Sequence, residues 1–418
     1  MSIFSGYLLI RNATQVVTCS GFAGKKGKEM SNVGVIENGA VAVEDGYITH
    51  VGPTQKVLKQ IKADRYTEIN AKGCTLIPGF VDSHTHFVFG GYRENEFAEH
   101  LKKGNNISVT EYNKGVLNTM KATRESTYGK LYDPVRELLD EMFHMGITTI
   151  EGKTGYGLEK WTEIRQLRIM DELRSEYPVD IISTFMAAHA IPPEYEGRPD
   201  KYVDYIIEDI LPEVHNEHTA KFFDVFCEPE IFSVKQCERL LKAGRSHRFK
   251  LKVHADEFTS SGGAELAVKM KAFSADHLIN ISDNGIKSLA QSDVIATLLP
   301  LTSLSSGRPY APARKLIEAG CAVALATDFN PCSNFSFSIP LLFALACLKM
   351  RMTPEEALTA LTINGAAALN MAKKTGSIDI GKKADMVLLK FPSYKFLPYH
   401  AGMNIVEIII KDGILYML

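Results

Sequence analysis

The 418-residue sequence lacks an apolar run long enough to cross a bilayer, and this excludes a membrane-spanning helix. Its most apolar stretch, from Leu341 to Leu348, predicts a short core helix instead. The chain does not open with a basic segment followed by a long apolar one, so we expect no secretory leader.

Cysteine is sparse, and neither sign of charge predominates. The seven cysteines form no CxxC pair, which favours reduced thiols in a cytoplasmic protein. The formal net charge is only −2, so the chain as a whole has no electrostatic attraction to nucleic acid or to an anionic membrane. We therefore expect no nucleic acid and no membrane as partner.

What the sequence does contain is the composition of an ordinary globular enzyme, 45% hydrophobic and 23% charged. A chain of this length suits a large barrel together with a smaller domain.

Short β-prone runs occupy both ends of the chain. Two hairpins are predicted, because Asp-Gly dipeptides separate the runs at Asp45-Gly46 and at Asp412-Gly413. Chain ends often lie close together, so we expect one small β-sandwich domain from residues 1–75 and 378–418. The runs are 7–10, 39–43, 47–51, 385–389, 406–410 and 414–416.

Between residues 76 and 377, short apolar runs alternate with longer amphipathic segments. Repeated βα units favour a parallel sheet, and their number favours a closed (β/α)8 TIM-like barrel over an open sheet. The predicted fold class is therefore α/β, with the barrel inserted into the small β-domain. Strands are predicted at 147–150, 179–185, 249–253 and 323–326, and a helix from Glu159 to Tyr177.

The most informative motif is PGFVDSHTH, at 78–86, in which a β-prone segment ends in two histidines. Positions i and i+2 of a strand point to the same face, so His84 and His86 can reach one metal ion. An HxH pair also arises by chance, and its other ligands must come from distant parts of the chain.

Further polar residues follow other predicted strands. In a parallel barrel the carboxyl ends of the strands meet at one face, where the active site is built. A lone histidine there is more often structural than a ligand, but five of the twelve histidines converge on this face. Imidazole and carboxylate groups suit zinc or ferrous iron, and a catalytic site leaves one position open for water. The additional residues are Lys153, His189, His254, Asp276, His277 and Asp328.

These segments resemble the metal-dependent amidohydrolase superfamily and, within it, the imidazolonepropionase family. HxH identifies only the superfamily, whereas KTGYGL at 153–158, AHAIPPEY at 188–195 and TDFNP at 327–331 are much more specific. The matching segments run in the family's order and cover nearly the whole chain.

The resemblance implies a role for each matching residue. Glu257 matches a carboxylate that handles the proton of the water, and His277 matches a histidine near that water. Asp328 counts both as a metal ligand and as a catalytic residue. The metal ligands are matched by His84, His86, His254 and Asp328. The substrate-binding positions are matched by Arg93, Tyr156, His189 and Asn330.

For the whole chain, the resemblance implies hydrolysis of the cyclic amide bond of 4-imidazolone-5-propanoate to N-formimino-L-glutamate in histidine degradation. The expected cofactor is one divalent metal ion, Zn²⁺ or Fe²⁺, which activates the attacking water. The expected partner is this small imidazolone carboxylate, and a homodimer is implied as well.

One segment departs from the family pattern. The family has a tyrosine a short way after the arginine and then a run of glycines, whereas residues 102–115 read KKGNNISVTEYNKG. Tyr112 stands at a shifted position, only Gly115 remains of the glycine run, and Cys332 replaces the glycine after the family's Asn-Pro. We interpret 105–115 as an altered recognition loop, which bears on the substrate more than on the reaction class.

Several of these residues also have a purely structural interpretation. Glu257 could be a solvated carboxylate at the start of a helix, where it would favour the helix dipole. Arg93 could form a surface ion pair, and Tyr156 could pack its ring in a glycine-flanked loop. Asp276 could orient His277 or bond to the backbone.

Alternatives also stay open at the level of function. Lys153 could be carboxylated and bridge two metal ions, as in two-metal relatives. The chain could act as a hydrolase or deaminase on another cyclic amide or nitrogen heterocycle. It could also be a non-catalytic binding protein that retains the barrel.

Overall fold

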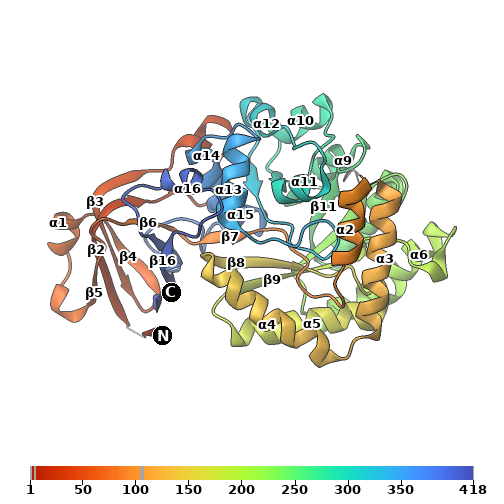
Figure 1. Cartoon of the computed structure of the whole chain (residues 1–418), viewed down its shortest axis with the longest axis horizontal. Helices are drawn as coiled ribbons and strands as arrows, with labels where there is room; N and C mark the ends of the chain where they lie inside the picture. Colours follow the sequence, from red (N-terminus) through yellow and green to blue (C-terminus); the bar gives the residue numbers. More distant parts are fainter. Residues whose placement is uncertain (1, 4–5, 104–107, 418) are drawn as a thin grey trace.

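Eight parallel strands surround the centre of the larger part of the molecule (Figure 1). The structure is a computed structural model that describes residues 2–3, 6–103 and 108–417. Each strand pairs with its neighbours in sequence, from β7 to β14. The bounds are β7 Phe80–Asp82, β8 Ile147–Lys153, β9 Asp180–Ala188, β10 Phe222–Cys227, β11 Lys250–Ala255, β12 Ser274–His277, β13 Ile295–Leu298 and β14 Val323–Leu325.

The segments that follow the first and last strands meet and bring the ends of the sheet together. The amide of Asp328 donates to the carbonyl of His84 at 3.0 Å, and the amide of His86 donates to the carbonyl of Phe329 at 2.8 Å. Thr85 and Phe329 form a parallel bridge. The predicted TIM-like barrel is confirmed, and this junction sets the HxH motif beside Asp328.

Helices lie around the barrel (Figure 1), and most of them connect one barrel strand to the next along the chain. The predicted helix from Glu159 to Tyr177 is confirmed as α5 Lys160–Glu176, and the apolar stretch lies in α13 Ile339–Leu348. The other helices are α1 Thr54–Leu58, α2 Glu94–Lys103, α3 Val109–Glu125, α4 Tyr128–His144, α6 Pro199–Tyr205, α7 Leu211–Glu217, α8 Val234–Ser246, α9 Gly263–Lys269, α10 Asp283–Ala290, α11 Pro300–Ser306, α12 Ala313–Ala319, α14 Pro354–Ala360, α15 Ile363–Ala368 and α16 Phe396–Tyr399.

The two β-rich ends of the chain meet in one nine-stranded mixed sheet beside the barrel (Figure 1). Its two halves join where β6 pairs antiparallel with β15. The order is β1-β17-β16-β15-β6-β2-β3-β4, with β5 on β2. The bounds are β1 Ser2–Ile3, β2 Tyr7–Val17, β3 Val35–Glu44, β4 Tyr47–Pro53, β5 Thr67–Asn70, β6 Thr75–Pro78, β15 Met386–Leu389, β16 Val406–Lys411 and β17 Ile414–Met417.

Both predicted Asp-Gly hairpins are confirmed. Asp45 and Gly46 have φ values of 48° and 83°, and Asp412 and Gly413 have 50° and 76°, as the favoured two-residue turn requires. The two turns touch, since a Cβ added to Gly46 would lie 2.9 Å from the carbonyl oxygen of Asp412. The glycines therefore serve both the turn conformation and the contact between the two chain ends.

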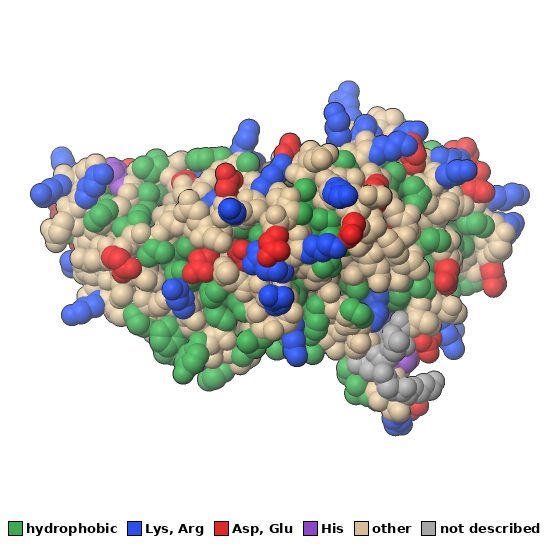
Figure 2. Space-filling model, turned by 90° about the horizontal axis from the view of Figure 1, so that it is seen from above, with side chains coloured by type: hydrophobic (Ala, Val, Ile, Leu, Met, Phe, Trp, Pro, Cys, Tyr) green, Lys and Arg blue, Asp and Glu red, His purple; other side chains and the backbone are tan. Residues whose placement is uncertain are grey.

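Buried charges attach the mixed sheet to the barrel. Lys411 of β16 contacts Asp385 at 3.0 Å and Asp180, the first residue of β9, at 3.2 Å. On the face shown in Figure 2, side chains of both signs are interspersed among apolar ones. Within the described part of the chain, no helix is long and apolar enough to cross a membrane.

Candidate metal centre and active site

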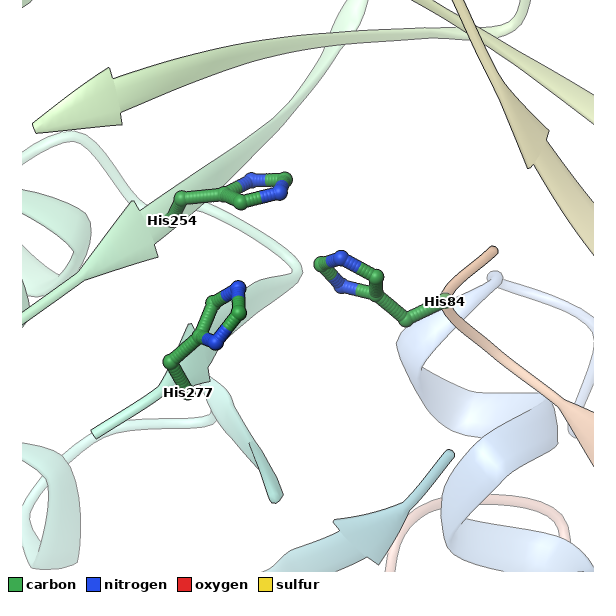
Figure 3. Close-up of side chains that lie close together, drawn as sticks. All are labelled: His84, His254 and His277. Carbon is green, nitrogen blue, oxygen red and sulfur yellow. The ribbon is translucent and has the colours of Figure 1, made fainter. Parts of the chain in front are cut away.

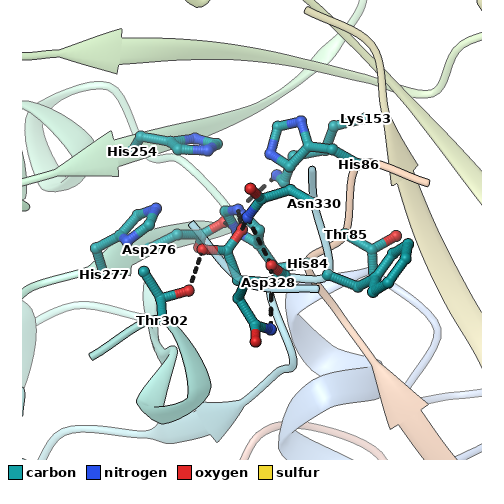
Figure 4. A network of polar contacts seen from close by, with 12 residues as sticks. His84, Thr85, His86, Lys153, His254, Asp276, His277, Thr302, Asp328 and Asn330 are labelled. Atoms are coloured by element: carbon teal, nitrogen blue, oxygen red, sulfur yellow. Dashed lines mark hydrogen bonds and ion pairs between the residues drawn. The ribbon is translucent and has the colours of Figure 1, made fainter. Parts of the chain in front are cut away.

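The HxH motif directs two imidazole nitrogens toward one point at the carboxyl end of the barrel (Figure 4). His84 Nδ1 lies 2.7 Å from Asp276 Oδ2, and His86 Nδ1 lies 3.2 Å from the carbonyl oxygen of Thr154. Such partners on Nδ1 set the ring orientation and leave Nε2 free as a metal ligand. His84 Nε2 has no hydrogen-bond partner among the described residues, although it is buried.

Two further histidines face His84 from strands β11 and β12 (Figure 3). The ring centroids of His84 and His254 are 4.5 Å apart, and those of His254 and His277 are 5.1 Å apart. One nitrogen from each of the three rings lies within 4.8 Å of the others. His254 Nδ1 lies 3.0 Å from Asp224 Oδ2, a close contact with a buried carboxylate that does not have hydrogen-bond geometry.

Asp328 approaches the same point from the loop after β14. Its Oδ1 lies 3.5 Å from His84 Nε2, and it forms a second candidate metal group with His84 and His86. Thr302 donates to its Oδ2 at 2.5 Å, and Asn330 donates to its Oδ1 at 3.0 Å (Figure 4). The carboxylate is therefore held in one orientation before any ligand binds.

The protonation states suit a divalent cation. Burial lowers the pKa of His84, His86 and His254 well below the usual value, so these rings are neutral and able to ligate. Burial and the nearby Glu257 raise the pKa of Asp328. A positive ion next to Asp328 would reverse that shift, because opposite charge favours the ionised carboxylate.

The carboxylates that contact His84 and His254 belong to a network of fully buried charges. Lys153 Nζ lies 2.6 Å from Asp224, 3.2 Å from Glu151 and 3.4 Å from Asp276. Burial tends to lower the pKa of Lys153, but the three carboxylates outweigh burial and raise it. Lys252 pairs with Glu151 at 2.5 Å. Three carboxylates thus face two ammonium groups, and ionised Asp328 adds a further negative charge, which a divalent cation would balance.

Glu257 and His277 form a pair beside the metal ligands. Glu257 Oε2 lies 3.5 Å from His277 Nε2 and has no hydrogen-bond partner among the described residues. Glu257 Oε1 pairs with Arg308, whose guanidinium also lies 4.0 Å from the ring centroid of Phe258. Burial lowers the pKa of His277. The arrangement is a buried carboxylate with one fixed and one free oxygen.

Tyr156, His189 and Tyr112 make an aromatic wall next to His86. His189 Nδ1 lies 3.0 Å from the carbonyl oxygen of Gly155, and its Nε2 lies 3.0 Å from the hydroxyl of Tyr112. Burial lowers the pKa of His189 to about 4, so the ring is neutral at pH 7. Tyr112, which stands at a shifted sequence position, thus reaches the site.

Arg93 and Tyr156 meet around the thiol of Cys332. The hydroxyl of Tyr156 lies 3.6 Å from Cys332 Sγ, and Thr119 of α3 lies 3.9 Å from it. A surface hollow of about 710 Å³ opens beside Arg93 and Cys332. Its lining includes Tyr92, Arg93, Phe97, Cys332, Asn334 and Phe335.

The structure gathers all ten predicted site residues at one end of the barrel, and it corrects the interpretation of one segment. Asn330 has both amide atoms engaged within its own loop, with Asp328, Cys332 and Ser333. The segment interpreted as an altered loop is helical from Val109, because Ser108 and Glu111 form a capping box at the start of α3. Residues 105–107 of that segment lie outside the described residues.

The pattern of strand ends did not indicate five of the residues found here. Three of them are charged residues inside strands β8, β10 and β11, namely Glu151, Asp224 and Lys252. The other two, Thr302 and Arg308, lie on and after α11. A charged residue within a buried strand is the signal that sequence could have used for the first three.

Comparisons with known proteins agree with this arrangement. Residues 232–415 match the family described as "Amidohydrolase family". The chain is 61% identical over 411 residues to the imidazolonepropionase of Parabacteroides distasonis, covering 98% of this chain and 99% of that protein. It is 52% identical over 408 residues to the imidazolonepropionase of Clostridium tetani, covering 98% and 97%.

Solved structures show the shared fold. The chain is similar to atrazine chlorohydrolase TrzN from Arthrobacter aurescens TC1 complexed with zinc, with a TM-score of 0.74, 16% identity, and coverage of 97% of this chain and 94% of that one. It is also similar to an adenosine deaminase from Xanthomonas campestris with bound zinc, with a TM-score of 0.68, 18% identity, and coverage of 97% and 92%.

Proposed function

The chain belongs to the imidazolonepropionase family of amidohydrolases, and from this premise we propose which of its residues carry the reaction. It hydrolyses the cyclic amide bond of 4-imidazolone-5-propanoate to N-formimino-L-glutamate in histidine degradation. The observation that carries this conclusion is the full-length identity to imidazolonepropionases. The convergence of four histidines and Asp328 at one face agrees with it.

We assign the metal to His84, His86, His254 and Asp328. Three observations support this assignment: Nε2 of His84 has no hydrogen-bond partner among the described residues, the imidazoles are neutral, and the buried charges have a negative excess. A divalent ion held there would lower the pKa of a bound water to roughly 7 and would so supply a nucleophile at neutral pH. Zinc and ferrous iron both accept this donor set.

A single metal ion fits the chain better than a bridged pair. Carboxylation of Lys153 needs a neutral amine, but three buried carboxylates hold this ammonium in its charged form. Loss of the charge would also leave those carboxylates uncompensated in the barrel interior. We therefore infer an unmodified Lys153.

We propose that Glu257 takes the proton of the attacking water through its free Oε2. It then returns a proton to the ring nitrogen as the carbon–nitrogen bond breaks, which is general base and general acid catalysis by one group. Arg308 holds the other oxygen and keeps the carboxylate aimed. His277, neutral and within reach of the same centre, donates a hydrogen bond to the oxygen that gains negative charge.

Arg93 is assigned to the propionate of the substrate. A guanidinium binds a carboxylate well, and Nη1 of Arg93 is buried without a nitrogen or oxygen acceptor among the described residues. Tyr156 and His189 contact the ring in this proposal, and Tyr112 supports His189 through their 3.0 Å hydrogen bond. Asn330 contributes by ordering the loop that carries Asp328.

The test is turnover of freshly generated 4-imidazolone-5-propanoate by the metal-loaded protein, with substrate loss and formiminoglutamate formation both followed. We expect fast hydrolysis that His254→Ala and Glu257→Gln abolish. His247→Ala, at the carboxyl end of α8, is the matched control and should retain activity. Ammonia release would instead indicate a deaminase, and no turnover by folded, metal-loaded protein would refute the assignment.

We propose three further properties of the protein. We infer zinc or ferrous iron as the ion, a homodimer as the assembly, and the cytoplasm as the location. Elemental analysis of protein purified without chelators tests the first, with about one metal ion per chain expected. Sedimentation equilibrium tests the second.

A further inference from the structure

Helix α3 carries a glycine near its middle, where a helical backbone gives no reason for one. Gly115 is buried within Val109–Glu125, away from both ends. Glycine destabilises a helix interior relative to alanine, because it loses more backbone freedom on folding. The missing side chain must therefore be explained by what lies against the helix.

The guanidinium of Arg93 occupies this space. A Cβ added to Gly115 would overlap Nη2 and Cζ of Arg93 and lie 2.5 Å from its Nη1. Ala122 lies two turns further along α3. A Cβ added to Gly90, in the segment before α2, would lie 2.7 Å from the carbonyl oxygen of Ala122. The amide of Gly90 also donates to Thr123 at 2.9 Å. The segment from Gly90 to Arg93 thus lies on α3 through contacts that require glycine on one side or the other.

The position of the Arg93 guanidinium on α3 determines which of its nitrogens can donate a hydrogen bond to a ligand. Nε and Nη2 donate to Glu96 at 3.2 and 2.7 Å, and Asn118 of α3 donates to the other oxygen of Glu96 at 2.9 Å. Nη1 meets no nitrogen or oxygen acceptor among the described residues, although the side chain is only 8% exposed, and the thiol of Cys332 lies beside the guanidinium. A buried guanidinium with a free donor is suited to an anion.

We propose that Gly115 is a positioning residue for substrate recognition. Having no side chain, it lets the Arg93 guanidinium lie on α3 with Nη1 free for the carboxylate of the substrate. The inference rests on the proposed function, in which Arg93 binds that carboxylate. Helix α3 would then contribute to the site in two places, since Tyr112, one turn before Gly115, contacts His189 from the same helix.

Binding of two probes to the metal-loaded protein tests the proposal. Imidazole propionate carries the ring and the carboxylate, and 4-propylimidazole carries the ring alone. In Gly115→Ala we expect roughly tenfold to hundredfold weaker binding of imidazole propionate, the size of one lost charge-assisted contact. Binding of 4-propylimidazole should not change, and KM should rise while kcat stays near its original value. Gly129→Ala, an exposed helix position with free space around its Cβ, is the matched control.

A cycle with Arg93 separates this inference from the function on which it rests. Gly115→Ala should add little to the loss already caused by Arg93→Lys, because the fork that needs the space is gone. If Arg93→Ala leaves imidazole propionate binding unchanged, the assignment of Arg93 fails. If Arg93→Ala weakens binding and Gly115→Ala does not, or if the two losses are additive, the positioning role of Gly115 is overturned.

Stability provides a readout that does not depend on activity. Gly115→Ala should lower the urea midpoint of the unaltered chain, because its methyl group collides with Arg93. In an Arg93→Ala background the same change should raise the midpoint, because alanine favours the helix. A raised midpoint in both backgrounds would overturn the packing argument.

Discussion

At the scale of single residues, the site depends on backbone conformations that side chains seldom adopt. Asp328 has a φ of 53°, His277 a φ of 76° and Asp256 a φ of 51°. Such positions cost energy and persist only where the surroundings impose them, commonly at functional sites. Sequence could predict that these residues gather, because strand ends share one face. It could not predict the turns of the backbone that aim them.

Asp276 shows how a residue without a ligand role can control the metal. Its Oδ2 lies 2.7 Å from His84 Nδ1, so Asp276→Asn should weaken metal binding about 10- to 100-fold, because the ring loses its charged partner. Competition with a chromogenic chelator measures the affinity. Asp283→Asn, at an exposed ion pair on α10, is the control. Unchanged affinity in Asp276→Asn would contradict the orienting role.

Arg308 gives a second prediction at this scale. Its loss leaves Glu257 buried beside His277 without its charged partner, so Arg308→Ala should lower kcat/KM by up to about 100- to 10,000-fold, the typical contribution of general acid–base catalysis. Arg308→Lys should recover part of the loss, because an ammonium can still reach one oxygen. Metal content should stay constant in both variants, and a fall in metal content would instead place Arg308 with the groups that stabilise the ion.

At the scale of elements, the sequence indicated most strands that carry site residues but missed the role of α3. Strand ends were predictable because buried parallel strands are short apolar runs. The helix start at Ser108 had a readable signal, a serine followed three residues later by Glu111. The sequence did not show that α3 packs on the segment before α2, since that contact joins residues 22 to 33 positions apart and depends on the shapes of the two surfaces.

Glu163 fixes the element that carries Tyr156. From the first turn of α5, its Oε1 accepts the amides of Gly155, Gly157 and Leu158 at 3.2, 2.8 and 2.9 Å. Glu163→Ala leaves three donors without this partner and should cost about 1–3 kcal/mol of unfolding free energy and raise KM. Urea unfolding and steady-state kinetics measure the two effects. Glu176→Ala, at the far end of the same helix, should have little effect on stability or KM. Equal effects from the two substitutions would contradict a specific role of Glu163 in holding this loop.

At the scale of the whole molecule, composition and the alternation of strands and helices were enough to predict a barrel with a small β-domain. The pairing of β6 with β15 and the contact between the two Asp-Gly turns could not be derived, because nothing local links residues more than three hundred positions apart. The sequence also did not show that Lys153 and Lys252 form buried ion pairs, since the side chain of either lysine could have faced solvent.

Alkaline pH should destabilise the molecule through its buried thiols. Burial raises the pKa of Cys19 from 9.0 to about 11, so between these values the folded chain keeps a proton that the unfolded chain releases. The contribution of this protonated thiol to the free energy of unfolding is therefore fully present below about pH 9. It is lost as pH rises toward 11, a loss of roughly 2–3 kcal/mol. Urea unfolding with reductant from pH 8 to 11 should show a shallower decline in Cys19→Ala. An identical decline in both chains would contradict this origin.

The pairing of β6 with β15 also sets an order on folding. Until β15 to β17 arrive, β6 presents an unpaired edge, and such an edge is a template for pairing with other chains. The whole barrel lies between the two strands, so closing the sheet requires contacts of very long sequence separation, which form slowly. A nascent chain would thus carry its catalytic barrel well before it could protect that edge, and its yield would depend on how fast the last strands dock.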